Sequence, residues 1–481
     1  MRYVNSSSIT PIGAMAGPIR VHLRSSAFSL LFLLAGCAVG PDYKKPEVAA
    51  PQAYKEAGTW VVAKPSDTVP KGKWWEAFRD PILSGLVEQV EVSNQTLAAA
   101  AARYRQAQAA TAGARSGFFP VLGYDVNGQR QGQGTGVVTG SGIGNRYTAE
   151  LNARWEIDLW GNIRRQVEAA GAAEQASAAD LNNARLSLQA QLVANYYLLR
   201  VADVNADLLE DTVKAFETSL KMTQNRYVGG VAAKVDVVQA QAQLASTQAS
   251  LVDLKSTRAS LEHSIAVLIG KPPADFTLAP VKFDVHIPDI PPGIPSTLLE
   301  RRPDIAEAER NMAAANARIG VATAAYFPAL DLSGYYGSAA SATSQLLKAP
   351  FRIWAVGADL AGTIVDFGAR SSQVDVARAQ YDEQVANYRQ AVLAGFQEVE
   401  DNLAAVHWLA EETKVEQEAV RAARESVTLT VNQYKAGTVS YLNVVTVQAT
   451  QLSEEAKLVT LLGRRLSATI VLMRALGGTW E

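Results

Sequence analysis

The stretch SGFFPVL at residues 116–122 returns as AAYFPAL at residues 324–330, 208 residues further along the chain. In both copies an alanine-rich segment precedes an aromatic–proline pair, and alternating apolar and polar residues follow it. Proline breaks a helix and disfavours helical backbone at the residue before it. The stretch therefore marks a change from helix to strand, and its recurrence indicates two copies of one unit.

Two further matches support the duplication. The sequence EIDLWG at residues 156–161 matches IVDFG at residues 364–368, with the loss of one residue. Beyond that point RYVGG at residues 226–230 matches QYKAG at residues 433–437 at an offset of 207. Because three separate matches share one deletion, we interpret the chain as a tandem duplication.

The segments after each proline have the period of two that a half-exposed strand requires. In residues 147–157 the odd positions are apolar and the even positions are polar. The glycine- and serine-rich residues 132–145 connect this segment to an alternating partner. Four such strands are typical of a membrane β-barrel, and a soluble hairpin packed on a core is the alternative. In the second copy Leu151 matches Asp359, out of phase, which favours a β-bulge there.

The proline-free stretches predict long helices over Asn162–Arg226 and Ala369–Gln433, each about 65 residues or roughly 98 Å long. Shorter helices flank each long one, and their summed length approaches it, so we expect pairs of short helices to stack beside the long helices. Such helices form a tall bundle rather than a compact globule.

The number of strands predicts oligomerisation. Two hairpins supply four strands, and about eight strands are the minimum for a barrel that encloses a lumen. Lipid offers no partner for an unpaired strand edge. We therefore expect several protomers to share one barrel, and the sequence does not give their number.

The N-terminus has the features of a bacterial lipoprotein signal. Three arginines are the only charged residues before Asp42, and a short apolar run ends in Leu-Ala-Gly followed by Cys37, the only cysteine. This pattern predicts cleavage before Cys37 and acylation of its thiol and amine, with a buried structural cysteine as the alternative. Two acyl chains anchor a protein stably, and Ala rather than Asp at residue 38 favours sorting to the outer membrane.

Composition excludes several functions. The 481 residues include 45 basic and 47 acidic ones, without the basic runs that nucleic-acid binding requires. One cysteine and four scattered histidines exclude a disulfide framework and indicate no metal site. Residues 140–144 are glycine-rich but open no helix, so they are not a phosphate loop. We expect no enzyme and no cofactor, and we interpret Glu398, Glu400 and Asp401 as a solvated or lumen-facing stripe.

Four further stretches carry a family resemblance: CAVGPDY at residues 37–43, WWEAFRDP at 74–81, PSTLLERRPDI at 295–305 and ALGGTW at 475–480. They resemble the TolC-like outer membrane factors, or outer-membrane efflux proteins, in their lipoprotein (NodT-type) branch. The resemblance covers essentially the whole mature chain. It implies a mainly α protein with membrane β structure, in which a homotrimer forms a twelve-stranded outer-membrane β-barrel on a long-helix α-barrel.

The resemblance also implies a function. Such channels passively conduct small toxic compounds or drugs from an inner-membrane pump of the RND type, through a periplasmic adaptor (membrane fusion) protein, to the exterior. The expected partners are thus a second and third copy, the adaptor, the pump and outer-membrane lipid, with no nucleic acid. Two alternatives remain at this point: a duct for secreted proteins, and a non-conducting, lipid-anchored periplasmic coiled-coil scaffold. The period-two segments favour a channel, since a scaffold has no need of them.

The family's helix-turn tips contact the adaptor and close the tunnel. The resemblance places the adaptor contacts at Arg226, Tyr227, Gly229, Gly230, Lys435 and Gly437. It places the pore constriction at Leu442, Asn443, Thr446 and Tyr434, and the last of these matches a tyrosine that latches the closed state.

Two departures from the family pattern concern the gate. Many members have pore aspartates where this chain has Asn443 and Thr446, and Val439 replaces a latch arginine. A ring of carboxylates attracts cations. We therefore expect a neutral, polar constriction with a weakened latch.

These interpretations divide the chain into segments. We expect a signal peptide over residues 1–36, a lipid-anchored N-terminal segment over 37–93, a first repeat over 94–271, a proline-rich equatorial linker over 272–301 and a second repeat over 302–481.

Overall fold

The computed structural model describes residues 38–46, 51, 53–55, 72–132, 143–281, 287–288 and 301–478. The described residues divide into two compact units. The sheet unit contains residues 38–42, 113–132, 143–168 and 316–378, and the helical unit contains the rest. Cys37 and the expected signal peptide lie outside the described residues.

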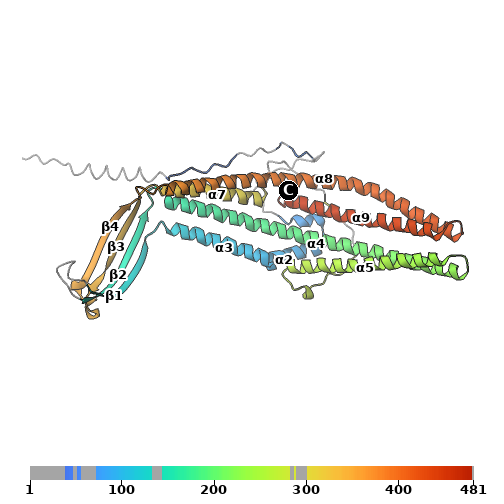
Figure 1. The fold of residues 1–481 in the computed structure, drawn as a ribbon, viewed down its shortest axis with the longest axis horizontal. Helices are drawn as coiled ribbons and strands as arrows, with labels where there is room; N and C mark the ends of the chain where they lie inside the picture. The colour runs from blue at the N-terminus through green and yellow to red at the C-terminus, as the bar shows by residue number, and fades with distance from the viewer. Residues whose placement is uncertain are drawn as a thin grey trace, which may run out of the picture. The chain divides into compact units, whose positions relative to one another are not determined.

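Four antiparallel strands form one sheet in the order β1-β2-β3-β4 (Figure 1). Each hairpin comes from one repeat, and β2 pairs with β3 across the two repeats. Within the described chain β1 and β4 have one neighbour each, so each keeps one unpaired edge. The strand bounds are Val121–Gly132 for β1, Ile143–Ile157 for β2, Ala329–Ala340 for β3 and Arg352–Ala361 for β4.

One face of the sheet is apolar and exposed. Tyr124, Leu151, Tyr336 and Trp354 stand opposite one another across the four strands. Their side chains are between 56% and 81% exposed, whereas soluble monomers rarely expose a contiguous apolar row of this kind. The register confirms the period-two prediction, and the face is suited to lipid.

The opposite face of the sheet is charged. Glu156, Asp331 and Asp359 form a row across β2, β3 and β4. Arg154 donates from Nε and Nη2 to the two carboxylate oxygens of Asp331, each at 3.2 Å. Apolar and charged faces that alternate along each strand are the pattern of a membrane strand with a polar lumen.

The β-bulge expected in the last strand is a wrong prediction. Strand β4 pairs with β3 residue for residue without interruption. Val121 pairs with Arg154 in the first hairpin, and Ala329 pairs with Ala361 in the second. The first strands of the two hairpins are therefore 208 residues apart but their partners are 207 apart. The connection between the two strands is therefore one residue shorter in the second hairpin. This difference in length places the apolar residues of β4 on the lipid-facing side.

The remaining described elements are helices. Helices α4 and α8 have 67 residues each, which corresponds to about 100 Å at 1.5 Å per residue. No described helix is both long and apolar enough to span a membrane. Short 3-10 turns cover Trp74–Phe78, Pro273–Asp275, Thr343–Gln345 and Ala349–Phe351. The helix bounds are Pro81–Ser93 for α2, Gln95–Ser116 for α3, Asn162–Val228 for α4, Lys234–Leu268 for α5, Pro303–Ala324 for α7, Ala369–Lys435 for α8 and Tyr441–Ala475 for α9.

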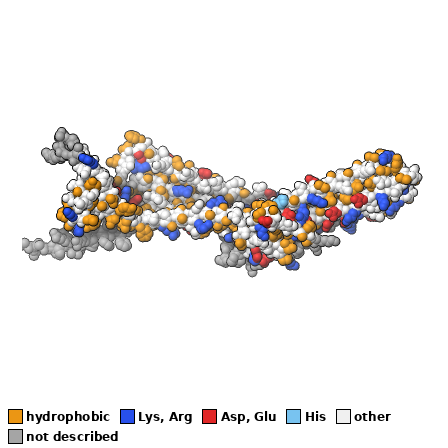
Figure 2. Space-filling model, turned by 90° about the horizontal axis from the view of Figure 1, so that it is seen from below, with side chains coloured by type: hydrophobic (Ala, Val, Ile, Leu, Met, Phe, Trp, Pro, Cys, Tyr) orange, Lys and Arg blue, Asp and Glu red, His pale blue; other side chains and the backbone are white. Residues whose placement is uncertain are grey.

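An aromatic core holds the helical unit together. Trp74, Trp75 and Phe78 are buried and pack with Tyr196 and Tyr197 of α4. The rings of Phe78 and Tyr197 lie 4.9 Å apart. The C-terminal ends of α5 and α9 contribute further aliphatic side chains to the same core. On the face shown in Figure 2, basic and acidic side chains are interspersed along the helices, in keeping with the near-neutral composition.

The carboxylates interpreted as a solvated stripe bind neighbouring segments instead. Glu398 accepts hydrogen bonds from Arg302, at 2.7 Å, and from Arg474. Glu400 accepts a hydrogen bond from the backbone amide of Lys55 at 2.7 Å. These two contacts were not predicted, because the periodicity of one helix does not reveal which distant segments pack against it. Both side chains are half-buried, and Asp401 is exposed.

Candidate functional site

Two helix–turn–helix tips join α4 to α5 and α8 to α9 in the helical unit. In each tip a glycine with positive φ ends the incoming helix, Gly230 at 75° and Gly437 at 80°. The amide after each glycine donates to the carbonyl five residues earlier, at 2.8 and 3.0 Å. These bonds form a Schellman motif. One residue of this motif has a left-handed backbone conformation, which glycine adopts more easily than any other residue. The geometry of the turn thus accounts for both glycines without any partner.

A small core lies behind the second tip. Tyr434 is 4% exposed and Tyr441 is 2% exposed, and their ring centres lie 5.5 Å apart. Val444 of α9 and Ala240 of α5 complete the core. Burial raises the pKa of Tyr441 to about 12, so this phenol stays neutral at physiological pH. In the single chain Tyr434 therefore lies beneath the tip surface.

Arg226 connects the two tips. Its guanidinium lies 4.6 Å from the centre of the Tyr434 ring, and its Nη1 donates to the carbonyl oxygen of Lys435 at 3.3 Å. Both contacts join the end of α4 to the end of α8 within the helical unit. A guanidinium over an aromatic face is a favourable cation–π arrangement. Sequence reasoning assigned Arg226 to the adaptor surface and missed this contact, because 209 residues separate the two partners.

The three other constriction residues share one exposed face at the start of α9. Leu442 is 56% exposed, and Asn443 and Thr446 are also exposed. The hydroxyl of Thr446 donates to the carbonyl of Leu442 at 2.9 Å, and the hydroxyl of Ser440 donates to Oδ1 of Asn443 at 3.3 Å. These polar groups are neutral.

The first tip is more apolar than the second. Val228 is 86% exposed, and Val231 and Val235 are also exposed next to Gly229. The Nζ atom of Lys234 lies 5.5 Å from the centre of the Tyr227 ring. A cluster of exposed valines beside a cation is suited to contact with another protein. The second tip presents Lys435, glycine and hydroxyl side chains instead.

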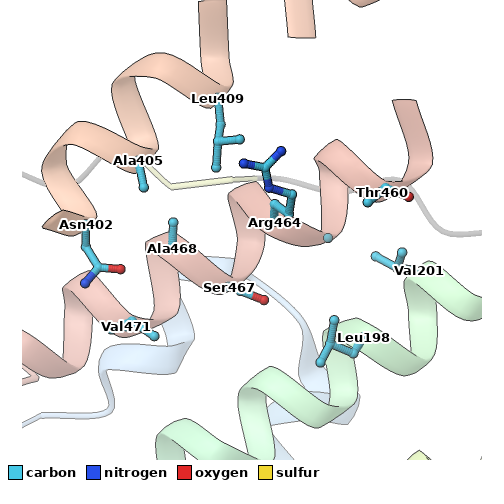
Figure 3. A pocket seen from close by; sticks show the side chains of 11 residues that line it. Leu198, Val201, Asn402, Ala405, Leu409, Thr460, Arg464, Ser467, Ala468 and Val471 are labelled. Atoms are coloured by element: carbon cyan, nitrogen blue, oxygen red, sulfur yellow. The ribbon is translucent and has the colours of Figure 1, made fainter. Parts of the chain in front are cut away.

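A cavity of about 560 Å³ lies between α4, α8 and α9 (Figure 3). Most of its lining is aliphatic or small, including Leu198, Val201 and Gly463. Its one charged side chain, Arg464, has Nη1 3.7 Å from Oε2 of Glu412. The cavity has no pairing of a nucleophile with a base. Within the described ranges no three histidine, cysteine, aspartate or glutamate side chains come together as a metal site.

Comparison with known proteins identifies the family. The model of the outer membrane efflux protein family matches residues 86–271 and 294–478, one match in each repeat. The chain belongs to the outer membrane efflux protein family. The double match also agrees with the tandem duplication read from the sequence.

Curated relatives span nearly the whole chain. The pyoverdine export outer membrane protein OpmQ of Pseudomonas aeruginosa is 31% identical over 473 residues, which cover 95% of this chain and 97% of the relative. Nodulation protein T of Rhizobium leguminosarum is 30% identical and covers 90% of this chain and 91% of its own length.

Solved structures give the same result. The outer-membrane channel OprN has a TM-score of 0.85 at 33% identity, over 92% of this chain and 100% of OprN. The CmeC channel of Campylobacter jejuni has a TM-score of 0.86 at 23% identity and covers 92% of this chain and 96% of its own. This efflux protein therefore has the TolC-like fold and acts as an efflux channel of the outer membrane.

Proposed function

We propose that three copies of the chain assemble into one duct. Each copy supplies four strands, and β1 of one copy pairs with β4 of the next, so that twelve strands close a barrel and satisfy both open edges. The apolar row through Tyr336 faces lipid, and the charged row through Asp331 faces the lumen. A non-conducting scaffold has no use for such a sheet, which argues against that alternative.

The duct receives its cargo from other proteins. A periplasmic adaptor binds the helix-turn tips, and an inner-membrane pump of the RND type supplies the energy. Relatives are named for pyoverdine export, toluene efflux and cation efflux, which are chemically unlike cargoes. Because chains of one family serve all of them, we assign cargo selection to the pump, and small toxic compounds or drugs to this duct.

A lipid anchor at Cys37 is the second part of the proposal. The motif Leu-Ala-Gly-Cys supports it, together with the basic and apolar segments before it. Acyl chains on Cys37 and the lipid-facing sheet give the protein two independent attachments to the outer membrane.

A neutral constriction is the third part, and the exposed face of α9 carries it. Leu442, Asn443 and Thr446 stand on that face without a carboxylate among them. In a trimer they form three stacked rings of uncharged side chains. Such a constriction excludes by size and hydration and does not concentrate cations.

Single-channel recording of the purified trimer in planar bilayers tests this constriction. The double variant N443D/T446D should become cation-selective and should be blocked by a trivalent cation such as hexaamminecobalt(III), whereas the parent channel should be insensitive to it. Asn432→Asp, on the exposed end of α8, is the matched control for added charge. Strong block of the parent channel that Asn443→Ala and Thr446→Ala remove would contradict the proposal.

A further inference from the structure

The first described residues are fixed to the sheet unit rather than extended away from it. We call residues Ala38–Asp42 the strap. The amide of Val39 donates to the carbonyl of Trp160 at 3.0 Å, and Nδ2 of Asn316 donates to the carbonyl of Pro41 at 3.0 Å. The strap thus touches the residues just before α4 in the first repeat and the C-terminal half of α7 in the second.

Arg165 is the centre of this contact. Its side chain is 5% exposed. Nε donates to the carbonyl of Val39 at 3.1 Å, and Nη2 donates to the carbonyl of Gly40 at 3.2 Å and to Oδ1 of Asp42 at 2.9 Å. Nη1 donates to Oε2 of Glu168 at 2.8 Å. The strap supplies three of the four acceptors of this buried cation, and hydrogen bonds from a charged donor are stronger than those between neutral groups.

Backbone contacts make the fit close. A Cβ atom on Gly161 would lie 2.7 Å from the Cα and Cβ atoms of Ala38. A Cβ atom on Gly40 would lie 2.4 Å from the Cα atom of Gly320. Both distances are shorter than real Cβ contacts allow, so the strap lies in this place only because glycine occupies these positions.

Two aromatic side chains stack at the place where the strap meets the sheet unit. The rings of Trp160 and Phe327 stack with centres 4.7 Å apart, and Nε1 of Trp160 donates to the carbonyl of Pro328 at 2.8 Å. Phe119 and Tyr326 are exposed at the two helix-to-strand changes, before β1 and before β3. We call Phe119, Trp160, Tyr326 and Phe327 the collar. Aromatic residues at the ends of membrane strands are typical of the membrane–water interface.

We propose that Arg165 is a positioning residue that docks the strap beside Trp160 and Phe327, so that the residues directly after the lipidated cysteine are held to the sheet unit and do not form a free tether. This inference rests on the lipidation of Cys37 in the proposed function. Its partner is the lipid surface of the periplasmic leaflet, which the exposed aromatic side chains of the collar contact.

Limited trypsin digestion of trimers purified in detergent, where the protease reaches both sides of the barrel, tests the inference. Lys44 and Lys45 follow the strap directly, and the Lys44–Lys45 bond is a trypsin site, whereas Pro46 protects the next bond. Cleavage requires local unfolding around the bond, so its rate reports release of the strap. Mass spectrometry of the released peptide gives both this rate and the acylation state of Cys37.

Arg165→Gln and Gly320→Val should each raise the cleavage rate about tenfold. The first removes charge-assisted hydrogen bonds, and in the second a Cβ atom would lie 2.7 Å from Cγ of Arg165 and displace the side chain that holds the strap. Arg165→Lys should give an intermediate rate. The controls are Arg318→Gln, an exposed arginine on α7, and Gly171→Ala, where a Cβ meets nothing within 4 Å. Heat-resistant trimer should persist in all of them, which separates strap release from a general loss of structure.

Two outcomes overturn different claims. Equal cleavage rates in the parent, R165Q and G320V proteins, with an acylated peptide, would refute docking while lipidation stands. An unacylated parent peptide would refute lipidation while strap release remains measurable. Should R165Q not form trimers, Asn316→Leu removes only the bond to the Pro41 carbonyl and must show the same faster cleavage.

Discussion

At the scale of single residues, Arg226 and Tyr434 form a contact that joins the two tips. The guanidinium covers the ring face, while the hydroxyl of Tyr434 and Nε of Arg226 are buried without hydrogen-bond partners. Buried polar groups without partners are costly, so this contact is only moderately stable. The resemblance to the TolC pattern predicts that Val439 replaces a latch arginine, so we expect the Arg226–Tyr434 contact to supply part of the missing restraint.

Arg226→Gln should therefore favour the open channel. Loss of a cation–π contact costs about 1 kcal/mol, which corresponds to a rise of about fivefold in the ratio of open to closed states. Single-channel recording measures this ratio as open probability. Lys221→Gln, an exposed cation one turn earlier on α4, is the control. An unchanged or reduced open probability in Arg226→Gln alone would show that the contact does not restrain the gate.

At the scale of elements, the sheet allows one substitution to be compared on its two faces. Tyr336 and Tyr335 are neighbours on β3, but Tyr336 pairs with Trp354 on the apolar face and Tyr335 pairs with Asn152 on the charged face. Tyr336→Arg should destabilise the barrel by about 2–4 kcal/mol, because it places a cation in lipid. Tyr335→Arg adds the same side chain to the lumen and should be tolerated. Heat-modifiable migration of the trimer on gels measures the difference, and equal loss from both variants would contradict the assigned faces.

Helix α7 carries a carboxylate that should make stability depend on pH. Burial, and then the charges of Asp180 and Asp304, raise the pKa of Glu307. At pH values above this raised pKa, Glu307 is ionised and its charge lowers the stability of the folded state. At pH values below the ordinary pKa of glutamate, the side chain is protonated in both the folded and the unfolded state, and this loss of stability disappears. Glu307→Gln should thus raise the unfolding temperature at about pH 7.5 and leave it unchanged at about pH 3.

The control for this prediction has the opposite sign. A hydrogen bond from Lys414 lowers the pKa of Glu411, so Glu411→Gln should not raise the unfolding temperature at neutral pH. Thermal melts of both variants at the two pH values check the pair. A stabilisation by Glu307→Gln that persists at acidic pH would assign the effect to packing rather than to charge.

Some features of these elements could be predicted from the sequence alone, and others could not. Period and proline spacing predict the alternating faces of the strands and the long helices, because these depend on local backbone preferences. The bulge prediction failed because a uniform offset between repeats cannot show that a connection is one residue shorter. The burial of Tyr434, its contact with Arg226 and the hold of Arg165 on the strap depend on residues far apart in sequence. No local sequence pattern predicts these contacts. One local signal does point to Arg165, because this arginine lies in the first turn of a helix that directly follows a tryptophan–glycine pair.

At the scale of the whole molecule, the proposed function gives membrane attachment two sources. The proposed acyl chains act on each copy alone, whereas the lipid-facing row of the sheet acts only once three copies close the barrel. Four strands with open edges are unstable in lipid, so we expect each copy to depend on the proposed anchor during the interval before assembly. The anchor should therefore matter more for the yield of trimers than for the stability of trimers already formed.

Cys37→Ser tests this order of events. It should block acylation and signal processing, and reduce the amount of trimer in outer-membrane fractions without abolishing it, because the period-two strands are intact. A second protein, in which a signal for an ordinary periplasmic protein is cleaved before residue 38, separates the loss of lipid from the loss of processing. Trimers that do form from this protein should resist heat as well as the acylated ones, since both share the same twelve strands. Full yield of mature, unacylated trimer would mean that the barrel alone suffices, and that the anchor serves a purpose other than holding single copies at the membrane until three of them meet.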